Sequence, residues 1–194
     1  LQRNAPESYE PYQCYWAMAR QQAQTEAALR QLDALIALNA DNYKARLYRG
    51  VIGCDNSLPN GPADVRAALA AATAAKDYRG EVYGWITLVY WSRQRAETDT
   101  LHDSLAHADA AATLSGADDL LRMVRAQRAW QSYRDGEYGL AYAAYRRMAD
   151  EIEGQPLDVS NWEVVDGLAA SAWAMYRYDE AIAAYRRVEE YLHS

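Results

Sequence analysis

The chain has 194 residues, which is long enough for one domain or for one run of several structural repeats. Hydrophobic residues make up 51% of it, and only 10 Gly and 5 Pro occur, a composition that favours helices. The formal net charge of −7 offers no basic field for phosphates and argues against nucleic-acid binding.

Helical patterning covers most of the chain. Residues 1–8 are polar with an early Pro, so we expect a flexible N-terminal arm. From Tyr9 onward apolar residues recur at helical intervals, most clearly over 25–38, and the clearest loop is DNSLPNGP at 55–62. No segment alternates like a strand, and the most apolar stretch, VYGWITLVYW at 82–91, is too short to cross a bilayer. We therefore expect an all-α protein of ten helices in five antiparallel pairs, without membrane insertion.

The five letters AAYRR occur twice, once at 143–147 and again at 183–187. We call the offset between positions 143 and 183 the repeat interval. Aromatic and small residues in the flanks agree as well. An interval of this size indicates stacked structural repeats, in which each repeat buries the apolar face of the next. In this interpretation the Ala residues pack inward, Tyr145 and Tyr185 fill the interfaces between helices, and the Arg pairs lie at the solvent edge.

Two segments resemble a known repeat family. AWQSYRDGEYGLAYAAYRRM (129–148) and AASAWAMYRYDEAIAAYRRV (169–188) each carry an aromatic residue before the turn, a Tyr after it, and Ala then Tyr on the second helix. In this they resemble the tetratricopeptide repeat (TPR), a helix-turn-helix unit of about 34 residues. The resemblance implies an α-solenoid with a right-handed superhelix, formed by a single repeat domain over 9–194. The expected repeats lie near residues 9–42, 43–79, 80–121, 122–161 and 162–194.

The same resemblance implies a ligand site. In TPR proteins the first helix of each repeat lines a concave groove, and particular positions of that helix commonly contact peptides. Carried onto this sequence, those positions are Arg20, Gln21, Trp91, Trp130, Tyr133, Arg134, Asp166 and Trp173. Aromatic and Arg side chains are typical of binding hot spots, although each Trp could instead pack between repeats. The Lys and Asn row that holds a C-terminal carboxylate in some members is absent, because Gln13, Leu47 and Gly84 stand there.

Signals for catalysis are weak. His102 and His107 are five positions apart, whereas a spacing of four would place two metal ligands on one helical face. Asp118 and Asp119 could suggest acid–base chemistry, but they open a predicted helix, where negative charge favours the helix N-terminus. No phosphate-binding loop or nucleophile motif occurs. We therefore expect no catalytic residues, no metal and no cofactor.

The two cysteines bear on the compartment. In the TPR register Cys14 and Cys54 differ by about 9 Å along the helix axes, beyond the reach of a disulfide. We expect two free, mostly buried thiols, which favours the cytoplasm, whereas a bridge between them would indicate the periplasm.

These observations favour a non-enzymatic protein–protein interaction module that binds a peptide or a protein surface in its groove. The alternative is a sensory or regulatory TPR domain of a larger bacterial signalling protein, such as a kinase, diguanylate cyclase or protease. Its partner would then be another domain of the same polypeptide. The ending VEEYLHS lacks a distinct polar capping helix, which favours a chain that continues. A helical enzyme with an unrecognised site is the third possibility.

Overall fold

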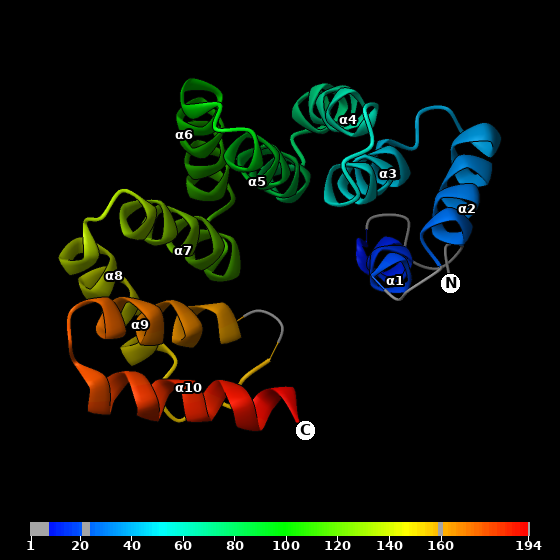
Figure 1. Cartoon of the computed structure of the whole chain (residues 1–194). Coiled ribbons are helices and arrows are strands. Elements are labelled where there is room, and N and C mark those ends of the chain that lie inside the picture. The colour runs from blue at the N-terminus through cyan, green and yellow to red at the C-terminus, as the bar shows by residue number, and fades with distance from the viewer. Residues whose placement is uncertain (1–7, 21–23, 159–160, 194) are drawn as a thin grey trace. The chain divides into compact units, whose positions relative to one another are not determined.

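The computed structural model describes residues 8–20, 24–158 and 161–193, and within them it contains ten α-helices and no strand (Figure 1). The predicted N-terminal arm lies outside the described residues except for Ser8. The helices are α1 (Glu10–Ala19), α2 (Thr25–Leu38), α3 (Tyr43–Asp55), α4 (Gly61–Ala75), α5 (Tyr78–Gln94), α6 (Thr98–Ser115), α7 (Asp118–Arg134), α8 (Tyr138–Glu151), α9 (Trp162–Ala174) and α10 (Tyr178–Leu192).

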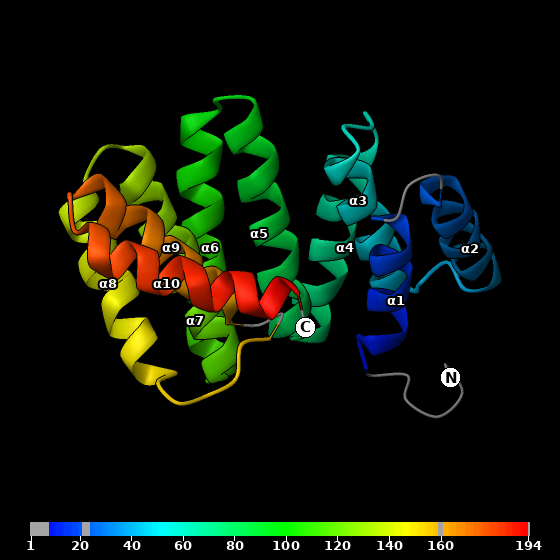
Figure 2. The ribbon, with the colours of Figure 1, turned by 60° about the horizontal axis from the view of Figure 1, so that its bottom comes forward.

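The helices form two compact units. Unit 1 (Leu1–Ser115) holds the pairs α1–α2, α3–α4 and α5–α6, and unit 2 (Gly116–Ser194) holds α7–α8 and α9–α10. Within each unit every helix packs against the next one in the chain, as the adjacent α5 and α6 in Figure 2 show. The predicted all-α class and the sequential antiparallel pairing are therefore confirmed, and the packing is consistent with a helical repeat. A single repeat domain over 9–194 stays a prediction.

The turns between paired helices recur at the repeat interval. Ala96, Gly136 and Tyr176, each one repeat interval from the next, end α5, α7 and α9 in the left-handed region, with φ of 56°, 83° and 62°. A backbone hydrogen bond closes each turn in the same way: Glu97 N–Ser92 O at 3.0 Å, Glu137 N–Ser132 O at 2.9 Å and Arg177 N–Ala172 O at 2.9 Å. A left-handed residue with this bond satisfies carbonyls that a helix end leaves open. Three helix pairs thus share one turn geometry.

The interpretation of AAYRR holds for α8 but not fully for α10. Tyr145 is 3% exposed, and its hydroxyl donates a hydrogen bond to the backbone carbonyl of Ala126 at 3.0 Å. Tyr185, the equivalent residue, is 40% exposed, so the prediction that it fills an interface is wrong. The reason is that α9 covers this face of α8, whereas none of the described helices packs in the same way on the equivalent face of α10.

The other letters of AAYRR are confirmed in part. All four Arg side chains of the two copies are exposed, as predicted. The second Ala of each copy, Ala144 and Ala184, lies half-buried or buried, whereas the first, Ala143 and Ala183, is exposed. A helix turns by about 100° per residue, so two adjacent Ala residues cannot both face the same neighbouring helix.

Glycine on a first helix makes room for a large side chain from the preceding second helix. The ring of Tyr145 in α8 packs so closely over Gly167 in α9 that a Cβ atom there would overlap it. Gly84 in α5 has the same relation to Leu69 in α4, whose Cδ2 would lie 2.6 Å from an added Cβ. Atoms in a packed interior do not approach this closely, so each glycine sets the spacing between two successive pairs.

We expect Gly167→Ala to lower the free energy of unfolding by about 1–3 kcal/mol, because the added methyl group overlaps the buried Tyr145 ring. Gly139→Ala is the matched control, since Gly139 also lies in a helix but has no atom within 4 Å of an added Cβ. That substitution should raise stability by about 0.4–1 kcal/mol. Urea denaturation of both variants measures the difference. Equal effects of the two substitutions would contradict the packing described.

Candidate protein-interaction surface

Aromatic side chains flank the turns of unit 2 in a repeated arrangement. Tyr133 of α7 meets Tyr138 of α8 with ring centroids 5.3 Å apart, and one repeat interval later Trp173 of α9 meets Tyr178 of α10 at 4.9 Å. Trp130 stacks on Tyr133 at 5.1 Å with an interplanar angle of 14°. We call these five residues the aromatic edge. Because the same contact recurs in both helix pairs, it belongs to the repeat itself.

Much of the aromatic edge is open to solvent. Trp173 is 54% exposed and Tyr178 45%, whereas Trp130 is half-buried against the core of unit 2. Tyr176, in the turn between α9 and α10, is 80% exposed and meets Tyr178 edge-on at 6.1 Å. Large aromatic residues that are anchored at one end and exposed at the other are typical of binding hot spots. The aromatic edge is therefore suited to contact a partner.

A carboxylate lies near this surface. Asp166 of α9 is half-buried, and no hydrogen bond or ion pair to another described residue compensates its charge. Burial therefore raises the pKa of Asp166 above its usual value. The pKa of Tyr185 is also raised, first by burial and then by Asp166 and Tyr133, so both of these groups lie near Tyr185. A half-buried carboxylate of this kind can accept a cationic group from a ligand.

The predicted groove residues of unit 1 lie in a different environment. Arg20 caps α1, and its guanidinium lies 5.0 Å from the Trp16 ring centroid, while the Trp16 indole N–H donates to Asp55 at 2.7 Å. Gln21 lies outside the described residues. In unit 2, Arg134 is exposed and follows Tyr133 at the end of α7. Of the predicted set, the structure brings Trp130 and Tyr133 into contact, whereas Trp173 stands at the equivalent turn of the next pair. Asp166 and Tyr133 each lie near Tyr185.

Trp91 does not share the position of Tyr133 and Trp173. It is half-buried against the core of unit 1, with the Arg95 guanidinium carbon 3.2 Å from its ring centroid. One repeat interval before Tyr133 stands Arg93 instead, which lies 5.6 Å over the Tyr90 ring. The sequence analysis did not identify Arg93 as the equivalent of Tyr133, nor Tyr138 and Tyr178 as members of the aromatic pairs. The matching residues Glu97 and Glu137, one repeat interval apart after the turn, are the sequence signal that aligns Arg93 with Tyr133.

Asp77 organises the interior of unit 1. It is the N-cap residue of α5 and accepts the Gly80 backbone N–H at 3.1 Å. The hydroxyl of Tyr43 donates to the same carboxylate at 2.8 Å, and so does the hydroxyl of Tyr9. Lys44 Nζ lies 3.9 Å from Asp77 Oδ2 and 4.6 Å from the Tyr9 ring centroid. One carboxylate thus connects the beginnings of α1, α3 and α5.

The ionisation of this cluster indicates a structural role. Burial alone would raise the pKa of Asp77, but hydrogen bonds from Tyr9, Gly80 and Tyr43 and the charge of Lys44 outweigh it and lower that pKa. Burial, followed by the hydrogen bond and the charge of Asp77, raises the pKa of Tyr9, which therefore stays protonated and keeps donating. These groups stabilise one another in fixed protonation states rather than exchanging protons.

We expect Asp77→Asn to lower the free energy of unfolding at pH 7 by about 1.5–3 kcal/mol, the range for hydrogen bonds to charged groups. Because the folded state lowers the pKa of Asp77, its contribution is present above about pH 4 and is lost as the pH falls toward the folded-state value. As the pH falls below about 4, the unfolding free energy of the variant should therefore decrease less than that of the wild type. Urea denaturation across pH tests this, with exposed Asp99→Asn as control. The prediction is contradicted if Asp77→Asn and Asp99→Asn lower the unfolding free energy at pH 7 by the same amount.

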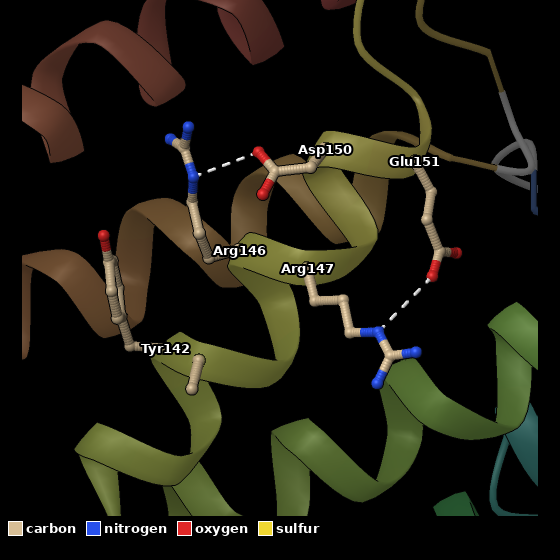
Figure 3. A pocket seen from close by; sticks show the side chains of 6 residues that line it. Tyr142, Arg146, Arg147, Asp150 and Glu151 are labelled. Carbon is tan, nitrogen blue, oxygen red and sulfur yellow. Dashed lines mark ion pairs between the residues drawn. The ribbon is translucent and has the colours of Figure 1, made fainter.

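An open hollow lies along α8, lined by Tyr142, Ala143, Arg146, Arg147, Asp150 and Glu151, with a volume of about 740 Å³. The dashed lines in Figure 3 mark two ion pairs within it, Arg146 Nε–Asp150 Oδ1 at 3.1 Å and Arg147 Nε–Glu151 Oε1 at 3.9 Å. Arg146 also contacts Glu180 at 3.2 Å. The charges of this hollow therefore compensate one another along the helix, and none of them points to a ligand.

The thiols are as predicted in one respect and not in another. Cys14 and Cys54 are both free, which confirms that they form no disulfide. Cys54 is buried, and burial, followed by the charge of Asp55, raises the pKa of its thiol to about 12. Cys14 is exposed, so its predicted burial is wrong, because α2 and α3 are the only described helices that pack against α1.

The remaining predicted features are surface features. His102 and His107 are exposed, and His107 stacks on Trp85 at 4.5 Å. Asp118 and Asp119 lie in the first turn of α7, as predicted. In the described part of the chain, no three His, Cys, Asp or Glu side chains are grouped so as to hold a metal ion. None of the described helices is both long and apolar enough to span a bilayer.

Comparisons of the chain with models of protein families, with curated proteins and with solved structures give no match. What the structure itself establishes is an all-helical protein of ten helices among the described residues, packed sequentially in pairs. Function is therefore inferred from the geometry of this chain's own residues.

Proposed function

We propose that the chain is a non-enzymatic, TPR-like interaction module that binds a peptide or a protein surface through the aromatic edge. The observation that carries this proposal is the contact between Tyr133 and Tyr138 and its recurrence at Trp173 and Tyr178, in two successive helix pairs. Successive pairs present successive aromatic anchors at one spacing. An extended or helical segment of a partner can engage such anchors together.

The charge near this surface supports a basic partner. Asp166 is a half-buried carboxylate with a raised pKa, and a cationic side chain beside it would restore the stability of its ionised form. Arg and Lys also bind favourably over exposed Trp and Tyr rings, such as Trp173. The net charge of −7 adds a long-range attraction for basic chains. The ligand class that fits is therefore a peptide segment with Arg or Lys beside an apolar or aromatic residue.

We expect the double substitution Tyr133→Ala and Trp173→Ala to weaken peptide binding at least tenfold, because it removes one ring from each aromatic pair. The ligands are peptides selected from a random display library on the immobilised chain, and fluorescence anisotropy measures their affinities. Helical circular dichroism should persist. Leu140→Ala on the second helix α8, 63% exposed, is the control and should leave affinity unchanged. A library that yields no binder, or binders indifferent to the double substitution, would contradict the proposal.

We expect Asp166→Asn to separate stability from binding. The folded state raises the pKa of Asp166, so the ionised carboxylate lowers stability above about pH 4, and this effect disappears as the pH falls. The neutral amide should therefore raise the unfolding free energy at pH 7 while weakening the binding of selected basic peptides and its dependence on salt. Glu190→Gln, an exposed change of the same kind on α10, should alter neither quantity appreciably. Unchanged peptide binding would remove Asp166 from the proposed site.

A further inference from the structure

The repeat interval allows α8 and α10 to be compared residue by residue. Ala141 and Met148 of α8 are buried, and so are their equivalents Ala181 and Val188, since each pair faces the first helix of its own repeat. A second set is buried on α8 and exposed on α10. Tyr145 is 3% exposed, whereas its equivalent Tyr185 is 40% exposed, and Ile152 is fully buried, whereas its equivalent Leu192 is 68% exposed. The difference defines a face that a following helix covers on α8.

On α8 the structure shows what that following helix provides. Gly167 of α9 receives the ring of Tyr145, and Gly84 of α5 receives Leu69 of α4 in the same way. The second helix of the following pair, α10, provides a carboxylate. Glu180 accepts a hydrogen bond from the Tyr142 hydroxyl at 2.8 Å and another from Arg146 at 3.2 Å. A covering pair therefore supplies a glycine and a carboxylate at defined positions.

Helix α10 carries equivalents of the α8 residues that the following pair covers. Tyr185, Ile182 and Leu192, the equivalents of Tyr145, Tyr142 and Ile152, are exposed, and we call them the α10 outer face. Arg186, the equivalent of Arg146, is exposed as well. Ala149, which is buried on α8, is replaced by the exposed Glu189, so this face also carries a negative charge. The α10 outer face thus continues the α8–α9 interface, with one additional site for a basic group.

We propose that the α10 outer face docks a helical hairpin of a partner protein, whose first helix presents a glycine to Tyr185 and whose second helix presents a carboxylate to Arg186. A basic side chain of the partner would meet Glu189. The first helix of a second copy does not reproduce this fit, because α1 contains no glycine and any Cβ opposite the tyrosine ring would overlap it, as at Gly167. The proposal does not depend on the function proposed above, although Tyr185 lies near Asp166 and near Tyr133 of the aromatic edge.

The probe is a fluorescent peptide with the sequence of residues 154–193, which carries the glycine and the carboxylate in their native spacing. In the full chain α9 already covers α8, so the α10 outer face is the matching site that is left open for the peptide. Fluorescence anisotropy should show saturable binding. Tyr185→Ala in the chain should weaken it at least tenfold, and Arg186→Ala by a few fold. A peptide with Leu in place of Gly167 should not bind.

Two controls keep the outcome clear. Tyr176→Ala removes a more exposed ring outside this face, and Trp173→Ala removes an exposed ring of the aromatic edge, and neither should change affinity for the probe. Circular dichroism checks that Tyr185→Ala stays folded. The proposal is wrong if the probe does not bind, or if Tyr185→Ala and the Leu peptide bind as well as their parents. Self-association in sedimentation equilibrium that Tyr185→Ala abolishes would also overturn it, since the occupant would then be a second copy.

Discussion

The insertion of one large side chain against one glycine holds the successive helix pairs of this protein together. In unit 2 the ring of Tyr145 packs over Gly167, and in unit 1 the side chain of Leu69 packs over Gly84. Each contact fixes the separation between the second helix of one pair and the first helix of the next pair. A hydrophobic stripe alone tolerates sliding of one helix on another. A ring that fits only where a Cβ is missing does not, so these contacts determine the register in which pairs stack and in which surface groups recur.

In unit 1, hydrogen bonds to one carboxylate also fix how successive helix pairs are placed. Asp77 fixes the beginnings of three first helices, because it accepts from Tyr9 and Tyr43 while capping its own helix. Asn42, the N-cap residue of α3, repeats this on a smaller scale by accepting from the Tyr12 hydroxyl at 3.2 Å and from the Ala45 N–H at 3.0 Å. Hydroxyl groups of tyrosine thus connect neighbouring repeats, whereas phenylalanine, absent from the chain, could not.

Much of the architecture was accessible from the sequence, because helix period, loop composition and a repeated pentapeptide are local signals. The exposure of Tyr185 was not, since Tyr145 has the same neighbours in the chain and differs only in the helix packed on it. Nor was the Asp77 cluster, which joins residues 68 positions apart. Trp91 was assigned from a family register, and only the observed turns extended the repeat interval back to Arg93. Contacts between residues far apart in the sequence decided the first two cases, and the backbone geometry of the turns decided the third.

Tyr176 occupies the same left-handed turn position as Gly136, with φ of 62°. Glycine adopts that conformation freely, whereas a residue with a side chain loses roughly 1–2 kcal/mol there. At 80% exposure the Tyr176 ring returns little of this through burial. The Tyr176 side chain therefore does not recover the backbone strain of this turn. Ala96 adopts the same conformation at the equivalent turn between α5 and α6, so the pairing of the two helices imposes it, and the packing between them has to offset its cost.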